Sequence, residues 1–201
     1  MTTAQPLTQE AFQKLIQGAE SIEEDSHGPK VYRFKNGEYL KVFRRKRLLS
    51  SALLRPYSQR FWENASRLEE LGIPTVQPLQ LFKLATAGWT AIRYKALPGE
   101  TLRDLFTQHG ELSASLFEQL IELFKDLHRK GIYFRSLHLG NIVRTPEGQL
   151  GLIDIADLQF LAGPLSKDKI RRNLAHFERY LKHNGLADFP FDTLVKRVSQ
   201  P

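Results

Sequence analysis

The sequence GIYFRSLHLGNIVR, residues 131–144, is followed after a polar turn by QLGLIDIAD, residues 149–157. Asn141 stands directly before a short apolar strand, and a second apolar strand leads to Asp154. We therefore expect two oxygen-bearing side chains at neighbouring strand ends. Hard cations such as Mg²⁺ take oxygen ligands, and nucleotide phosphates usually complete such a site. The stretch predicts that Asn141 and Asp154 hold Mg²⁺ together with a nucleotide.

This pattern resembles the catalytic loop and metal-binding Asp of protein-kinase-like enzymes, in the "HGDLHPGN…LIDF" form of small bacterial sugar and aminoglycoside kinases. Within that group it is similar to the lipopolysaccharide core kinase family, the Kdo and heptose kinases. The resemblance implies an α+β, bilobal protein-kinase-like fold, with an antiparallel-sheet N-lobe and a mostly helical, shortened C-lobe. It also implies ATP and Mg²⁺ as cofactors.

The position of the catalytic Asp departs from the family pattern. Counting five residues back from Asn141, that position holds Ser136, and the preceding His position holds Phe134. A serine can orient a sugar hydroxyl but cannot take its proton at neutral pH, and a positioned general base contributes about 10²- to 10⁴-fold. His138 matches a His of the family's "D-L-H-P-G-N" pattern, with a structural role as the alternative. Ser136 and His138 are the candidate catalytic residues.

Composition favours one globular protein with a real core. The chain has 201 residues, 41% of them hydrophobic, and no cysteine, which excludes disulfides and thiolate metal sites. No apolar run approaches the roughly 18 to 20 residues needed to cross a bilayer. We therefore expect a cytoplasmic protein, with peripheral contact at the inner face of the cytoplasmic membrane as a further expectation.

The net charge of +7 is partly clustered, at residues 41–47 and 167–172. Such clusters attract phosphates of nucleotides, lipids or phosphorylated sugars, and the alternative is an ordinary solvated surface. No basic motif with interleaved aromatic residues is present, so a nucleic-acid partner is not expected.

The resemblance assigns the first half of the chain to the N-lobe. Residues 8–18 predict an amphipathic helix, residues 23–30 a polar turn, and Asn36-Gly37 a hairpin turn before a strand at residues 39–43. A further helix is expected at residues 58–72, with Phe61, Ala65, Leu68 and Leu71 on one face and Gly72 as its C-terminal cap.

The resemblance assigns roles to two charged residues of this half. Lys41 lies in the position of the strand-three Lys that pairs with the α- and β-phosphates, and Glu63 in the position of the helix Glu that holds that Lys. The alternatives are an exposed strand Lys and a solvent-facing helix Glu. The phosphate-covering glycine loop is degenerate, since Gly28 alone lies between the first two strands.

Residues 94–105, YKALPGETLRDL, match the family's hinge between the lobes. The resemblance implies that backbone groups of Lys95, Ala96 and Leu97 hydrogen-bond the adenine. We therefore expect a single kinase-like domain over 1–201, with an N-lobe at 1–94, a hinge at 95–100 and a C-lobe at 101–201.

Two periodic helices are expected in the C-lobe. The first, around residues 116–127, has Ser115-x-x-Glu118 as a capping box and His128 at its end, where a cation is favoured by the helix dipole. The second is a basic amphipathic helix at residues 169–181. No long activation segment follows Asp154, which disfavours a regulated protein kinase.

Two functions remain open from the sequence. The first is an ATP-dependent phosphotransferase acting on a sugar hydroxyl, with the lipopolysaccharide inner core as the acceptor that the family suggests. Its partners would be a nucleotide and a phosphorylated or anionic glycan. The alternative is a pseudokinase, a nucleotide-binding or scaffold protein that lacks the catalytic Asp.

Overall fold

A computed structural model of the chain describes residues 3–44 and 55–200. It is an α+β structure that divides into two compact units, the first ending at Leu97 and the second beginning at Pro98. This boundary falls within the segment expected to be a hinge. We describe each unit separately below.

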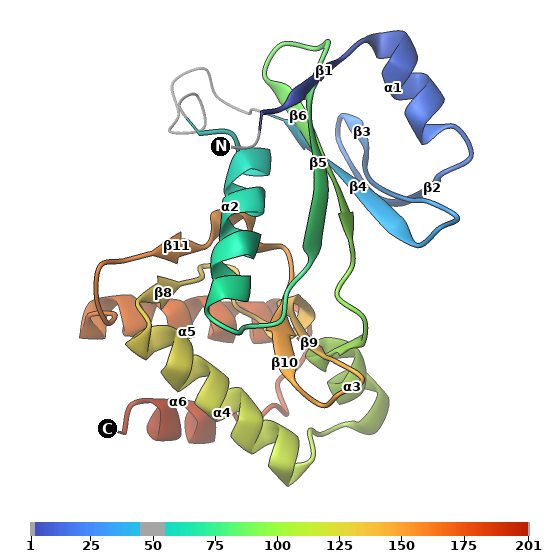
Figure 1. The fold of residues 1–201 in the computed structure, drawn as a ribbon. Coiled ribbons are helices and arrows are strands. Elements are labelled where there is room, and N and C mark those ends of the chain that lie inside the picture. The colour runs from blue at the N-terminus through green and yellow to red at the C-terminus, as the bar shows by residue number, and fades with distance from the viewer. Residues whose placement is uncertain (1–2, 45–54, 201) are drawn as a thin grey trace. The chain divides into compact units, whose positions relative to one another are not determined.

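Unit 1 is built on a six-stranded sheet with the order β1-β5-β6-β4-β3-β2 (Figure 1). The strands are β1 (Gln5–Leu7), β2 (Glu20–Asp25), β3 (Gly28–Arg33), β4 (Glu38–Arg44), β5 (Gln77–Leu84) and β6 (Trp89–Lys95). All neighbours pair antiparallel except β1 and β5, which pair parallel. The sheet is therefore mixed rather than wholly antiparallel as expected, because three residues too short to show a period add a parallel edge.

The predicted hairpin at Asn36-Gly37 is confirmed. Gly37 has a φ of 80° and its N–H donates to the carbonyl of Phe34 at 3.0 Å, while the side chain of Asn36 accepts from the Glu38 N–H at 3.1 Å. A positive φ carries no steric cost for glycine, so this pair turns the chain between β3 and β4.

The two faces of the sheet are covered by different helices, α1 (Gln9–Ile16) and α2 (Tyr57–Glu70). Leu40 and Val42 point to the face where α1 packs, in one buried cluster with Tyr32, Phe82, Leu84 and Ala91. The next residue, Phe43, points to α2, with its ring 6.1 Å from that of Phe61. Because successive side chains of β4 point to opposite faces of the sheet, each face has its own small core.

Two details of unit 1 differ from the sequence predictions. The turn expected at residues 23–30 is shorter, because β2 extends to Asp25 and pairs with β3. Charged cross-strand pairs such as Lys30 with Glu23, at 2.6 Å, suit this exposed edge strand. Leu71 lies after the end of α2 and is 37% exposed rather than buried, whereas Gly72 has the left-handed backbone expected of a cap.

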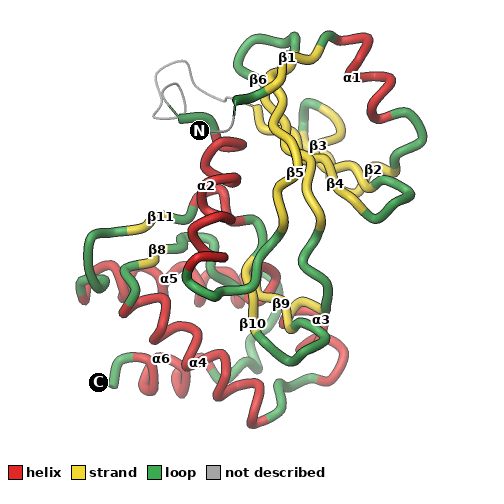
Figure 2. Tube along the Cα trace, in the orientation of Figure 1, coloured by secondary structure: helices red, strands yellow, loops and turns green. Residues whose placement is uncertain are grey.

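Unit 2 consists of helices with short strands between them (Figure 2). The helices are α3 (Leu102–His109), α4 (Ala114–Arg129), α5 (Lys167–His183) and α6 (Phe191–Val198). Leu120, Phe124 and Leu127 of α4 are fully buried, and the ring of Phe124 meets that of Phe177 on α5 edge-on at 5.4 Å. The apolar periodicity of both helices therefore forms one core.

The N-terminal cap of α4 corrects the expected capping box. The hydroxyl of Ser113, not Ser115, accepts the N–H of Leu116 at 3.3 Å. The helix begins at Ala114, so Ser115 lies within its first turn. Only Ser115 has the Glu three residues later that the capping-box signature requires, but the helix starts at Ala114, so the cap is Ser113.

The strands of unit 2 position its loops. β9 (Ile142–Arg144) and β10 (Leu150–Leu152) form an antiparallel hairpin, and β7 (Glu100–Thr101) pairs with β9. β8 (Ile132–Tyr133) pairs with β11 (Gln159–Phe160). Single 3₁₀ turns, η1 (Leu139–Asn141) and η2 (Ile155–Asp157), lie next to these strands.

No helix of the described residues is both long and apolar enough to span a membrane.

The close approach of β7 to β9 predicts a severe effect of Gly99→Ala. Gly99 has a φ of +129°, and a Cβ there would collide with the carbonyl of Arg144 and lie 2.9 Å from Cγ1 of Val143. Gly148, with a φ of +82° and open space around it, is the matched control. Gly148→Ala should cost about 1 to 2 kcal/mol from backbone strain alone, and Gly99→Ala clearly more, as measured by urea unfolding. Equal losses would contradict the contact.

Candidate active site

Asn141 and Asp154 are brought side by side by the β9–β10 hairpin. Asn141 ends η1 directly before β9, and Asp154 comes two residues after β10. Leu152 pairs with Ile142, and the next N–H, that of Ile153, donates to the carbonyl oxygen of Asn141 at 3.0 Å. The structure therefore places these two predicted ligand residues at one end of the hairpin.

Asp154 has the one positive φ of any non-glycine residue in the described ranges, with φ 51° and ψ 43°. Aspartate tolerates this left-handed conformation better than most residues, yet it carries strain. The following residues Ile155 and Ala156 are buried and anchor the backbone. Asp154 itself is exposed.

The amide of Asn141 is held by two neighbours. Its nitrogen donates to the carbonyl oxygen of Ser136 at 2.9 Å and lies 3.2 Å from Nε2 of His138. Since the nitrogen is used in these bonds, the amide oxygen is the atom that Asn141 would offer to a cation. Asn141 is thus both a brace of the loop and a candidate ligand.

His138 is packed face to face against Tyr180 of α5, with ring centroids 3.9 Å apart and planes 2° from parallel. Burial lowers the pKa of His138 to about 4, partly opposed by the nearby charge of Asp154. The imidazole is therefore neutral at pH 7, and its Nε2 can accept from the Asn141 amide. This contact gives His138 a positioning role toward Asn141.

Ser136 has a carboxylate beside it that the sequence reasoning did not select. Its hydroxyl donates to Oδ2 of Asp157 at 2.7 Å, and Nε of Arg135 lies 3.5 Å from the same oxygen. Asp157 ends η2, three residues after Asp154. Both strand-end loops thus contribute to one polar cluster. The only sequence signal for Asp157 was its position three residues after Asp154.

A second hydrogen-bond network, formed by His128 and Asn173, holds the backbone at Phe134. It corrects the interpretation of His128. His128 is buried and its Nε2 lies 3.0 Å from Oδ1 of Asn173, while the Asn173 nitrogen donates to the carbonyl of Phe134 at 2.7 Å. Burial lowers the pKa of His128, so the helix-end cation that we expected is wrong. The buried Phe134 is fixed through its backbone carbonyl.

The residues expected to contact nucleotide from unit 1 lie as follows. Lys41 is 6% exposed on β4, with Nζ 5.9 Å from the centre of the Phe43 ring. The carboxylate of Glu63 on α2 accepts from Nε of Arg55 at 2.6 Å and from Gln59 at 3.1 Å. An ion pair between Lys41 and Glu63 stays a prediction.

The remaining predicted residues follow β6. Lys95 ends this strand, opposite Glu38 of β4, and Lys95 and Ala96 are exposed. Leu97 is the last residue of unit 1 and is partly buried. Their role in binding adenine stays a prediction.

Few protein ligands are available for a metal. Within residues 3–44 and 55–200, no group of three or more His, Cys, Asp or Glu side chains could hold an ion. A cation at Asn141 and Asp154 would therefore need phosphate oxygens and water to complete its shell. This two-ligand arrangement fits Mg²⁺ bound with a nucleotide, because Mg²⁺ keeps few protein ligands in such sites.

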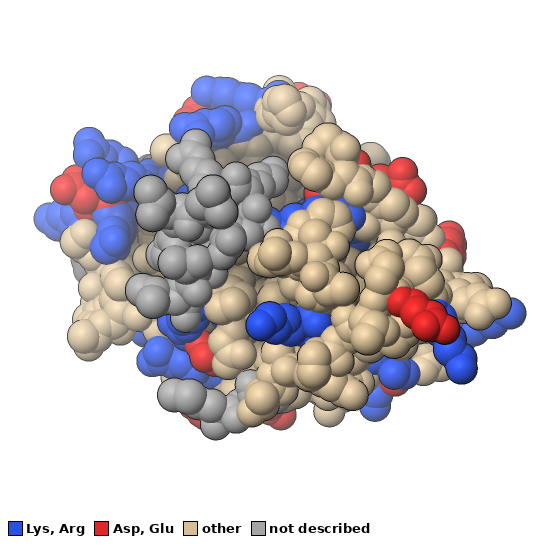
Figure 3. Space-filling model, turned by 90° about the horizontal axis from the view of Figure 1, so that it is seen from above, with Lys and Arg blue, Asp and Glu red and all other residues tan. Residues whose placement is uncertain are grey.

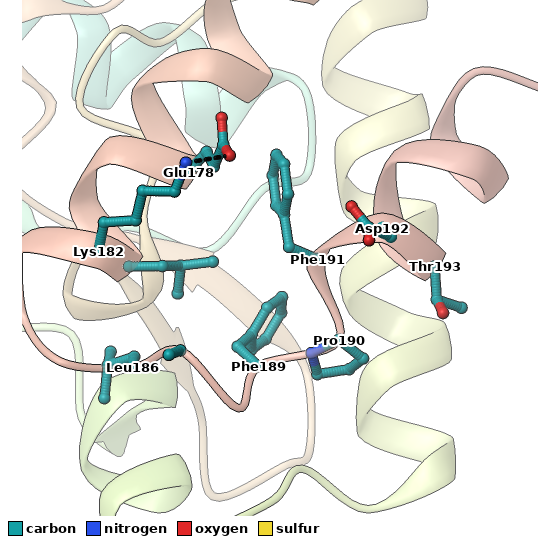
Figure 4. Close-up of a pocket in the computed structure, with 10 residues that line it drawn as sticks. Glu178, Lys182, Leu186, Phe189, Pro190, Phe191, Asp192 and Thr193 are labelled. Atoms are coloured by element: carbon teal, nitrogen blue, oxygen red, sulfur yellow. Dashed lines mark hydrogen bonds and ion pairs between the residues drawn. The ribbon is translucent and has the colours of Figure 1, made fainter.

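Two hollows lie elsewhere in unit 2. The smaller, of about 450 Å³, is lined by Phe189, Phe191 and the ion-paired Glu178 and Lys182 (Figure 4). The larger, of about 1110 Å³, lies among α4, α5 and α6. Neither is lined by Ser136, Asn141, Asp154 or Asp157.

The two basic clusters of the sequence belong to different units of the chain. Lys and Arg side chains lie in separate groups on the face drawn in Figure 3, several beside acidic ones. In the cluster at 167–172, Arg171 pairs with Asp168 at 3.0 Å and Lys169 lies over the ring of Tyr133. Residues 45–47 of the other cluster lie outside the described residues.

Comparison of the sequence with protein-family models and with curated proteins found no match.

The buried stacking of His138 predicts its titration. NMR should show its imidazole protonating at about pH 4, because burial disfavours the cation. Below pH about 6.5 the unfolded chain then binds a proton that the folded chain does not, so the free energy of unfolding falls as pH decreases toward 4. Tyr180→Ala should raise the pKa of His138 by exposing the ring. A His138 pKa near 6.5 in the unaltered protein would contradict this.

Proposed function

We propose that the protein is an ATP- and Mg²⁺-dependent phosphotransferase of protein-kinase-like fold. The observation that carries this proposal is the hydrogen bond from the Ile153 N–H to the Asn141 carbonyl, which sets Asn141 beside Asp154. An amide and a carboxylate at adjacent strand ends form an oxygen-donor pair. Such a pair suits phosphoryl transfer, which relies on positioning and charge neutralisation more than on covalent chemistry.

In this proposal Asn141 and Asp154 hold the cation, which would neutralise phosphate charge when bound. The left-handed backbone of Asp154 fixes the direction in which its side chain leaves the chain. The contact with Nε2 of His138 keeps the Asn141 amide oriented. Lys41 would pair with the α- and β-phosphates, Glu63 would hold that Lys, and the backbone of residues 95–97 would hydrogen-bond the adenine.

The proposed acceptor is a sugar hydroxyl, in the class of the lipopolysaccharide inner core. Two observations support it: the net charge of +7 favours an anionic glycan, and the half-buried Ser136 offers a hydroxyl that can align another hydroxyl. Peripheral contact with a membrane surface would follow from such an acceptor.

A pseudokinase is the second candidate function. It is favoured by Ser136 itself, because the residue in the catalytic position carries no carboxylate. The two candidates share nucleotide binding and differ in turnover. Incubation with Mg²⁺, ATP and dephosphorylated lipopolysaccharide core oligosaccharide separates them. Phosphate on the glycan supports the transferase, whereas binding of ATP without transfer supports the pseudokinase.

Asp154→Asn tests the nucleotide site. The variant should keep its fold, since Asn also adopts left-handed backbone, but should lose at least tenfold in Mg²⁺-dependent affinity for a non-hydrolysable ATP analogue, measured by calorimetry. The matched control is Asp168→Asn, an exposed carboxylate on α5 paired with Arg171. It should bind as the unaltered protein does.

Equal Mg²⁺-dependent affinities for Asp154→Asn and the unaltered protein would refute the metal assignment. If the unaltered protein does not bind the analogue at all, both candidate functions fall.

A further inference from the structure

Ser136 is not isolated in the position where the family pattern has a catalytic carboxylate. Its hydroxyl donates to Oδ2 of Asp157 at 2.7 Å, and its backbone carbonyl accepts from Asn141 at 2.9 Å. The side chain is thereby oriented from both loops. The cluster therefore contains a carboxylate, that of Asp157, which is linked to position 136 through the Ser136 hydroxyl.

The surroundings of Asp157 distinguish it from an ordinary surface acid. Its side chain is 15% exposed, and Oδ1 is buried with no hydrogen-bond donor among the described residues. Burial raises the pKa of Asp157, opposed by the Ser136 hydrogen bond and by Arg135. A carboxylate with a raised pKa is a stronger base than ordinary aspartate.

Charged and titratable groups near Asp157 come from its own segment, from the loop of Ser136 and from α5. Arg135 belongs to the same loop as Ser136, Asp154 lies one turn back, and His176 faces it from α5. Arg179 of α5 acts on His176 in turn. Burial, with a smaller contribution from Asp154, raises the pKa of Asp157, whereas the Ser136 hydrogen bond and Arg135 oppose the shift.

We propose that Asp157 is a positioning residue that orients Ser136 and takes its proton, so that the two side chains together replace the missing catalytic Asp. This inference rests on the proposed function and deepens it. It selects the transferase over the pseudokinase, because it restores a proton acceptor to the position that lacks one.

The step balances without a further reactant. The acceptor hydroxyl oxygen attacks the γ-phosphorus, the bond from phosphorus to the β,γ-bridging oxygen breaks, and ADP leaves with that electron pair. The acceptor's proton passes to Oγ of Ser136 as the serine's own proton passes to Oδ2 of Asp157. The products are the sugar phosphate, ADP and a protonated Asp157, which then loses its proton to solvent.

If Asp157 had only a structural role, Asp157→Asn would have a different effect. The Ser136 hydrogen bond ties two loops together, and any acceptor of similar shape would preserve it. Asp157→Asn keeps an oxygen that accepts from Ser136 but removes the base. The variant therefore separates the proton-acceptor role of Asp157 from its role in holding the two loops together.

The test measures transfer from Mg²⁺·ATP to dephosphorylated lipopolysaccharide core oligosaccharide. Asp157→Asn should lower kcat by about 10²-fold or more, the lower end for a general base, with KM for ATP nearly unchanged. Below neutral pH the unaltered enzyme should lose activity as pH falls through the raised pKa of Asp157, and this limb should be absent from the residual activity of the variant. Asp168→Asn should change neither quantity.

Ser136→Ala keeps the inference testable if Asp157→Asn folds poorly, and two double variants extend the test. Ser136→Ala should lower kcat as much as Asp157→Asn, and the Ser136→Ala/Asp157→Asn double variant no further, because the two residues act as a unit. Ser136→Asp in the Asp157→Asn background should restore turnover by placing a carboxylate directly at the acceptor.

The outcomes separate the two proposals. An inactive unaltered protein that still binds ATP overturns the transferase and this inference with it. An active protein whose kcat and pH profile are unaffected by Asp157→Asn, or whose losses for Ser136→Ala and Asp157→Asn multiply, keeps the transferase and overturns the inference alone.

Discussion

One backbone hydrogen bond, from the N–H of Ile153 to the carbonyl oxygen of Asn141, determines the candidate site. It continues the pairing of β9 and β10 beyond Leu152 and so brings two loops together that are otherwise separated by the hairpin. Since a one-residue shift of register would turn every side chain to the opposite face, Asn141 and Asp154 meet only in this register. The left-handed backbone of Asp154 is the local strain that the arrangement tolerates.

Two polar networks also hold the segment that precedes Asn141. His128 and Asn173 hold the backbone of Phe134 inside the core, and Asp157 holds the side chain of Ser136 near the surface. Buried hydrogen bonds of this kind are costly when left unmade, so they favour one loop conformation over its alternatives. Phe134 and Ser136 are therefore both fixed in place, one by its carbonyl and the other by its hydroxyl.

Much of the fold could be predicted from local pattern, and the misses share a physical cause. The hairpin at Asn36-Gly37 and the cap at Gly72 were found because positive φ demands glycine there. β1 was missed because three residues carry no measurable period, and its parallel pairing with β5 joins segments more than seventy residues apart. His128 was misread because burial, which decides its charge, is a property of the packed helices α4 and α5.

The sequence by itself determined which residues can supply oxygen ligands, that Asn141 and Asp154 follow one another at strand ends, and that position 136 has no carboxylate. Composition and spacing decide these points because they depend only on residue type and on neighbours along the chain. Only the tertiary structure decided that Asp157 lies at hydrogen-bond distance from Ser136 and that His138 is a neutral ring stacked on Tyr180. Those contacts join separate segments of the chain, and their energies depend on burial and geometry, which sequence distance does not encode.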